Sequence, residues 1–217
     1  MAGKQKSATA YVALIADMVS SRSLSAARRS RAQKEFTGLV DGLNRLYRKQ
    51  LRAKFVITLG DEFQALLSTA DVIPKIVWGL EHHFTARELR LGFGYGRIHT
   101  AIHEYAINVD GPALHNARSA IEKAKDGGLR GGVFEGFGPD RDATLNGLAR
   151  VLHHQRVSWS SRQREVVALL HEGRKGIEAA ADLGITKQAV SRYAALAGWE
   201  AYREGEEGWT AALRTLQ

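Results

Sequence analysis

The amino-acid sequence predicts an α+β fold, in which a small and mostly antiparallel sheet is covered by helices and is followed by a small all-α helix-turn-helix domain. Two observations indicate this fold. Apolar runs typical of strands alternate with amphipathic helix patterns up to about residue 154, and beyond that point the pattern is only helical. A helix-turn-helix spacing also lies inside the helical part. We therefore expect two domains, 8–154 and 155–217, with a linker at 154–160.

The composition excludes several classes of protein. The chain has no cysteine, which rules out disulfides, thiolate zinc sites and cysteine nucleophiles. Residues 1–9 lack the apolar core of a signal peptide, and no apolar run reaches the roughly 18–20 residues of a membrane span. We therefore expect a cytoplasmic protein with no membrane partner. The formal net charge of +8 favours an anionic partner such as nucleic acid or a nucleotide.

The first expected elements are a buried strand and a long helix. Residues 11–16 (YVALIA) form a continuous apolar run, and Asp17 follows at its C-terminal end. Ser25 can cap the helix that comes next. Its apolar positions recur at helical spacing: Phe36, Leu39, Val40, Leu43, Leu46 and Tyr47. Its opposite face is basic, because ten Lys or Arg residues lie between Arg22 and Lys54; such a face is either solvated or a surface for an anion.

A hairpin and a second helix come next. The β-favouring runs 55–59 and 63–67 are separated by Gly60, Asp61 and Glu62, which is hairpin spacing with turn residues between the strands. Asp71 opens an amphipathic helix that contains Pro74 in its first turn.

Three glycines alternate with apolar residues in the segment 90–102: Gly92, Gly94 and Gly96. Glycine weakens a strand, so this pattern suggests another backbone, a helix or a ligand lying against the bare face. A helix over 111–125, a short strand or loop at 131–138 and a helix over 140–154 complete the domain. The order strand, helix, hairpin, helix, strand is ferredoxin-like, with three or four strands and two helices on one face.

The helix-turn-helix pattern occupies residues 176–195. Ala180 is the small residue where the two helices cross, Gly184 is the turn glycine, and Thr186 caps the second helix. The apolar offsets are filled by Ala179, Leu183, Ile185, Val190 and Tyr193. The exposed face of the second helix carries residues suited to double-stranded DNA: Thr186, Lys187, Gln188, Ser191 and Arg192. An ordinary helical hairpin is the alternative.

Three acidic residues stand at the ends of adjacent expected strands. Asp17, Asp61 and Glu62 offer carboxylate oxygens of the kind that Mg²⁺ prefers, and a bound Mg²⁺ could hold the phosphates of a nucleotide. They could also be polar turn residues with no ligand.

Four blocks of sequence carry a family resemblance. The motifs ADMVSS from Ala16, TLGDEF around Asp61, RLGFGYG from Arg90 and DGPALHNAR ending at Arg118 resemble the SatD family. The same blocks are remotely similar to the catalytic palm of class III nucleotidyl cyclases and to diguanylate cyclases. That resemblance implies a palm-like sheet, metal ligands at Asp17 and Asp61, and nucleotide contacts from Gly60, Gly94, Asn116 and Arg118.

Two departures from the cyclase pattern favour sensing over catalysis. Ile57 stands where cyclases have the lysine that reads the base, and Asn116 and Arg118 are two residues apart rather than four. We expect a homodimeric DNA-binding transcriptional regulator whose palm domain senses a nucleotide or a divalent metal. The alternatives are a Mg²⁺-dependent nucleotidyl cyclase or transferase with a DNA-targeting tail, and a scaffold without a ligand.

Overall fold

The computed structural model describes residues 9–20 and 25–214. The outer limits of the two expected domains, residues 8 and 217, and the basic residue Arg22 lie outside the described residues. The strands are β1 (Ala10–Met18), β2 (Leu51–Leu59), β3 (Glu62–Leu67), β4 (Leu89–Arg97) and β5 (Val133–Glu135). The helices are α1 (Ala26–Leu46), α2 (Ile73–His83), α3 (Pro112–Asp126), α4 (Pro139–Ser158), α5 (Ser161–His171), α6 (Gly176–Leu183), α7 (Lys187–Ala197) and α8 (Trp199–Arg214).

The expected α+β architecture is confirmed, and the segment 131–138, expected as a short strand or loop, contributes a fifth strand. The sheet has the order β2-β3-β1-β4-β5, and β1 lies antiparallel between β3 and β4. The fifth strand, β5, pairs with β4 in parallel. A parallel pair needs a crossover connection, and α3 supplies it.

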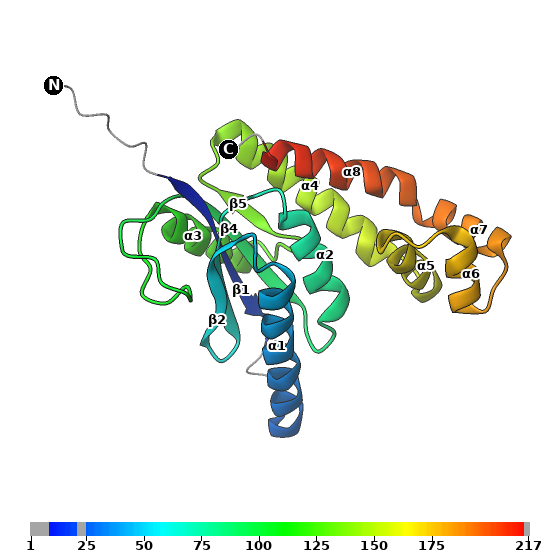
Figure 1. Ribbon diagram of the computed structural model, residues 1–217, viewed down its shortest axis with the longest axis horizontal. Coiled ribbons are helices and arrows are strands. Elements are labelled where there is room, and N and C mark those ends of the chain that lie inside the picture. Colours follow the sequence, from blue (N-terminus) through cyan, green and yellow to red (C-terminus); the bar gives the residue numbers. More distant parts are fainter. Residues whose placement is uncertain (1–8, 21–24, 215–217) are drawn as a thin grey trace.

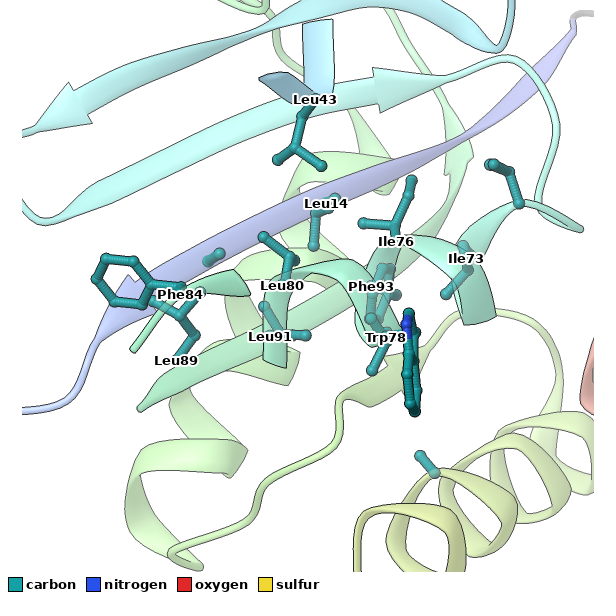
Figure 2. Packing of buried hydrophobic residues seen from close by; sticks show 14 of the residues in the cluster. Leu14, Leu43, Ile73, Ile76, Trp78, Leu80, Phe84, Leu89, Leu91 and Phe93 are labelled. Carbon is teal, nitrogen blue, oxygen red and sulfur yellow. The ribbon is translucent and has the colours of Figure 1, made fainter. Parts of the chain in front are cut away.

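Helices cover both faces of the sheet (Figure 1). On one face, Leu14 and Ala16 of β1 pack with α1 and α2 in the main hydrophobic core. Figure 2 shows Leu14 and Phe93 of the sheet beside Ile76 and Leu80 of α2. On the other face, Ala13 and Ile15 pack against α3. The alternation follows from the period of two along a strand, and it places Asp17 on the α3 face.

Packing against α3 accounts for the glycines of β4. A Cβ atom added to Gly94 would lie 2.1 Å from the backbone N of Ala117, and one added to Gly96 would lie 2.8 Å from the N of Ala113. The backbone of α3 therefore approaches the sheet more closely than side chains would permit. Of the three possibilities that the sequence left open, a helix lies against this face.

The C-terminal helices share the core of the sheet domain. Tyr202 and Trp209 of α8 are fully buried and belong to the same cluster as Leu14 and Phe93. Figure 1 shows α4 and α8 running side by side, with α5, α6 and α7 at one end of the pair. The segment 154–160, expected as a linker, contains the last turns of α4 and the buried Trp159. Hydrophobic packing therefore continues across the expected domain boundary.

Two local expectations need correction. Leu46 was expected on the buried face of α1, but it lies at the helix end and is 72% exposed, while Phe36, Val40 and Leu43 are buried as expected. The second helix begins at Ile73 rather than at Asp71, with Val72 as its N-cap. In the described part of the chain, no helix is long and apolar enough to span a bilayer.

Candidate functional site

The acidic residues expected to form a site meet at one end of the sheet. Asp17 is the register partner of Glu62 on β3 and of Arg90 on β4. Because side chains alternate between the two faces along a strand, all three residues belong to the face that α3 covers. Asp17 and Glu62 are both buried. The fold thus brings two carboxylates together on neighbouring strands, away from most solvent.

Glu62 is bound tightly by Arg118 of α3. The guanidinium donates from Nη1 to Oε2 at 2.5 Å and from Nη2 to Oε1 at 2.9 Å, a bidentate pair. Thr58 donates its hydroxyl to Oε1 at 3.0 Å. Burial alone would raise the pKa of Glu62, but the hydrogen bond and the positive charge from Arg118 outweigh it and leave the pKa below its usual value. Glu62 is therefore held ionised and in one orientation.

Asp17 lies between two basic side chains. Its Oδ2 is 3.4 Å from Nη1 of Arg90 and 3.3 Å from Nζ of Lys125. Its Oδ1 is buried and has no hydrogen-bond partner among the described residues. A buried oxygen without a donor is costly, so this atom is the part of the site with spare capacity for a ligand.

The hairpin turn lies beside Asp17. The backbone N–H of Met18 donates to the carbonyl of Asp61 at 2.9 Å, which fixes the turn against the end of β1. Gly60 is exposed in this turn and has a φ of 38°, in the left-handed region. Asp61 is half-buried. The structure therefore places Gly60, Asp61 and Glu62 at the same end of the sheet as Asp17.

Two of the expected nucleotide contacts lie elsewhere. Gly94 is covered by the backbone of α3. Asn116 donates through Nδ2 to the carbonyl of Tyr95 at 2.9 Å, and the same amide nitrogen would lie 2.1 Å from a Cβ atom added at Gly136. Both residues join α3 to the sheet. Of the two α3 residues expected to contact a nucleotide, Asn116 and Arg118, only Arg118 reaches a carboxylate of the site, that of Glu62.

The C-terminal helices form a helix-turn-helix supported by α5. Gly184 ends α6 in the left-handed conformation with a φ of 62°, and the hydroxyl of Thr186 accepts a hydrogen bond from the N–H of Ala189 at the start of α7. A separate hydrophobic cluster joins the three helices, with Val166 of α5 against Val190 of α7 and Ala179 of α6. The apolar offsets expected from the sequence all belong to this cluster: Ala179, Leu183, Ile185, Val190 and Tyr193.

The start and one face of α7 are open to solvent. The residues named as DNA contacts are all exposed: Thr186, Lys187, Gln188, Ser191 and Arg192. The side chains of Lys187, Gln188 and Arg192 therefore face solvent, while the hydroxyls of Thr186 and Ser191 also form hydrogen bonds with the backbone of α7.

Comparison with known families gives a match over most of the chain. The sequence model of the SatD family matches residues 11–182. The chain belongs to the SatD family. The matched span includes the sheet except for Ala10, both carboxylates, α5 and nearly all of α6. It stops before α7.

The fold of this chain is also similar to solved structures. Two matches are structures of a bacterial light-regulated adenylyl cyclase. The first has a TM-score of 0.40 at 12% identity and covers 54% of this chain and 70% of the other; the second has a TM-score of 0.39 at 13% identity and covers 54% and 40%. No curated protein matches the sequence.

Sequence reasoning missed two members of the carboxylate site. Arg90 and Lys125 approach Asp17, although neither was named as a site residue. The alternation of side chains along β4 would have placed Arg90 on the same face as the glycines. Lys125 follows Arg118 by seven residues, so both lie on one face of α3.

The carboxylate site offers few ligands to a metal. Within residues 9–20 and 25–214, no three His, Asp or Glu side chains are grouped so that they could hold an ion. Glu62 is already occupied by Arg118, so a cation would have to rest on Asp17 and Asp61. Carboxylate oxygens suit Mg²⁺, which commonly uses one or two protein carboxylates and keeps its remaining positions for water or phosphate.

Proposed function

We propose that this protein is a DNA-binding transcriptional regulator whose cyclase-like domain senses a nucleotide or a divalent metal. The helix-turn-helix carries the proposal. Its turn has the left-handed glycine and the capped second helix that this motif requires, and α7 offers polar side chains to solvent.

The chemistry of α7 suits double-stranded DNA. Arg192 can form two hydrogen bonds to guanine, and Gln188 can form two to adenine in the major groove. Lys187 at the start of the helix can pair with a phosphate, which positions the helix without reading sequence.

The low net charge of the C-terminal segment favours binding to DNA as a dimer. Residues 155–217 contain nine basic and eight acidic residues, a net of +1, so one module would neutralise few phosphates. Two copies related by a two-fold axis would read two half-sites about one helical turn apart. The exposed basic residues of α1, such as Arg28, Arg31 and Lys34, would add positive charge to the assembly.

The DNA-binding proposal is tested by selecting duplexes from a random library with the full-length protein and measuring Kd for the winning sequence. Arg192→Ala and Gln188→Ala should each cost about 1–3 kcal/mol, or roughly five- to 150-fold in Kd, on that duplex. Binding to a scrambled duplex should change much less. Arg141→Ala, an exposed arginine on α4, is the charge-matched control. Failure of the wild type to enrich any sequence would refute the proposal.

We propose that Asp17 and Asp61 are the residues with which the cyclase-like domain senses a divalent metal and its nucleotide. One divalent cation between them would give the buried Oδ1 of Asp17 a partner. When bound, Mg²⁺ supplies positions for phosphate oxygens, and Arg118 and Lys125 stand close enough to Glu62 and Asp17 to add positive charge.

The sensing proposal is tested by thermal melting with Mg²⁺ and each nucleoside triphosphate. A hundredfold excess of ligand over its dissociation constant should stabilise the wild type by about 2.7 kcal/mol, and only when metal and nucleotide are both present. Asp61→Asn should lose this effect, and Asp126→Asn, an exposed aspartate at the end of α3, should keep it. No stabilisation with any triphosphate would leave the carboxylates as structural residues. Rapid formation of a cyclic product would instead favour the enzyme.

A further inference from the structure

A cleft of about 650 Å³ lies on the α2 side of the sheet, the face opposite the one that carries Asp17 and Glu62. One wall comes from α2, the segment 84–88 that follows it, and the residues after β1. The other wall comes from the end of α4, from Trp159 and from Arg164 of α5. The volume lies within the range of roughly 300–1,000 Å³ that is usual for small-molecule sites.

The cleft is lined by four arginines and two glutamates. The arginines are Arg87, Arg130, Arg156 and Arg164, and the glutamates are Glu81 and Glu88. Glu81 is paired with Arg156 at 2.6 Å, and Glu88 with Arg130 at 3.0 Å. Both acidic charges are thus compensated, which leaves an excess of positive charge in the cleft.

Two of these arginines have N–H groups that lack acceptors. Arg156 is 7% exposed, and its Nη2 has no hydrogen-bond partner in the described part of the chain, although its Nε and Nη1 are bonded to Glu81 and Tyr202. Nε of Arg87 is also buried and has no hydrogen-bond partner among the residues that the structure describes. Leaving a charged donor unpaired is expensive, so these groups call for an anionic acceptor. Guanidinium groups bind the oxygens of phosphates and carboxylates especially well.

Most of the remaining lining is aromatic or apolar, and its polar members are Ser20, His82, Thr85 and His153. Trp78 and Trp159 line the cleft with ring centroids 6.2 Å apart, and Phe84 and Leu89 line it as well. A ligand of the matching chemistry has an anionic group beside a flat apolar body. Inorganic anions alone would leave the aromatic wall uncovered.

The cleft also adjoins the support of the helix-turn-helix. Trp78 of α2 stacks on His171 of α5 with centroids 4.0 Å apart, and it stacks on His82, which lines the cleft, at 5.3 Å. The same helix α5 contacts α7 through Val166 and Val190. A ligand between the two walls would therefore change how firmly α5 is held.

We infer that this cleft binds a small organic anion, with a phosphate or carboxylate group on a flat apolar body, and that its occupancy is transmitted to α5. The binding step is independent of the proposed function, whereas its use to regulate DNA binding rests on that function. The site differs in composition and location from the carboxylate site and requires no metal.

Binding is tested with the full-length protein by calorimetric titration in buffer with EDTA, which removes divalent metals. The probes are AMP, benzoate, adenosine and inorganic phosphate.

AMP or benzoate should bind at least tenfold more tightly than uncharged adenosine and than phosphate, and the better of the two identifies the anionic group. Arg87→Gln and Arg130→Gln should each weaken that probe by tenfold or more, while Arg150→Gln, an exposed arginine on α4, should not. Arg156 is left intact because its pairing with Glu81 contributes to the core. Absence of binding by every probe, or equal affinity in all four proteins, would overturn the site.

Transmission is tested by hydrogen exchange, which does not depend on whether the protein binds DNA. The bound probe should slow exchange of α5 amides at least threefold in the wild type and leave them unchanged in Arg87→Gln. Unaltered exchange in the wild type at saturation would overturn the transmission while leaving the site in place. A regulator should also show at least a fivefold change in DNA affinity with the probe. If no DNA is bound at all, the proposed function fails, and the calorimetric and exchange results still decide this inference.

Discussion

The close contact between α3 and the glycines of β4 predicts a graded loss of stability on substitution by alanine. A Cβ atom at Gly94 would lie 2.1 Å from N of Ala117 and 2.2 Å from O of Ala113, both backbone atoms of α3. Ordinary contact begins at 3.4 Å, so α3 would have to recede by about 1.3 Å. The methyl group cannot be accommodated by turning a side chain.

The cost follows from the size of the overlap. Overpacking a core usually costs about 1–3 kcal/mol, and Gly94→Ala should lie at or above the upper end because helix and strand backbones are forced apart. Gly96→Ala, with its nearest contact at 2.8 Å, should cost about 1–2 kcal/mol. Gly79→Ala is the matched control: this helical glycine of α2 has nothing within 4 Å of the added atom, and alanine should stabilise by about 0.4–1 kcal/mol.

The assay is urea unfolding of the full-length protein, followed both by tryptophan fluorescence and by circular dichroism. A loss of 3 kcal/mol should lower the midpoint by about 1–1.5 M for a slope of about 2–3 kcal/mol/M. Equal midpoints for Gly94→Ala and Gly79→Ala would show that α3 does not lie against β4 as described. A larger loss of stability in Gly96→Ala than in Gly94→Ala would show that the steric overlap with α3 does not determine the loss of folding free energy.

Three further predictions concern the C-terminal helices and pH. Gly184→Val should destabilise the protein by about 1–3 kcal/mol in urea unfolding, because a β-branched residue is strained at a φ of 62°; Gly208→Ala in α8, a glycine without a positive φ, should be neutral or stabilising in the same assay. A chain cut after His154 should fail to unfold cooperatively, since it lacks the buried residues of α8; a sharp melting transition would contradict the shared core. Stability should fall as pH drops through the acidic range: burial would raise the pKa of Glu81, but the hydrogen bond from His153 and the charge of Arg156 leave it lowered. A carboxyl with a lowered pKa stabilises the fold above its unfolded-state pKa and loses that contribution on protonation, so Glu81→Gln should have a flatter acid limb in melts between pH 3 and pH 6.

Several features followed from the sequence because they depend on local geometry. The period of two along β4 indicated a bare glycine face, and α3 lies against it. The spacing around Gly184 indicated a helix-turn-helix, and both the left-handed glycine and the cap at Thr186 are present. Backbone periodicity and turn conformation are decided by residues a few positions apart, so one sequence is enough to show them.

Other features were decided by contacts between distant parts of the chain. The partner of Glu62 is Arg118, 56 residues away, and Asp17 meets Lys125 of the same helix. The resemblance grouped Gly94 and Asn116 with Arg118, whereas in the fold they join α3 to the sheet. Which cation faces a carboxylate depends on how a helix lies across a sheet, and no local pattern carries that information.

The tertiary structure alone also joined the two expected domains. The change to a purely helical pattern near residue 154 suggested a boundary, but α4 continues to Ser158, and Trp159 and Trp209 are buried in the core that contains Leu14. Apolar residues on an amphipathic helix show that one face will be buried without showing against what. The sequence thus determined the elements and the residue types at the sheet end and on α7. Long-range packing determined which charges meet, which glycines are covered, and that the helix-turn-helix is attached to the sheet through a common core.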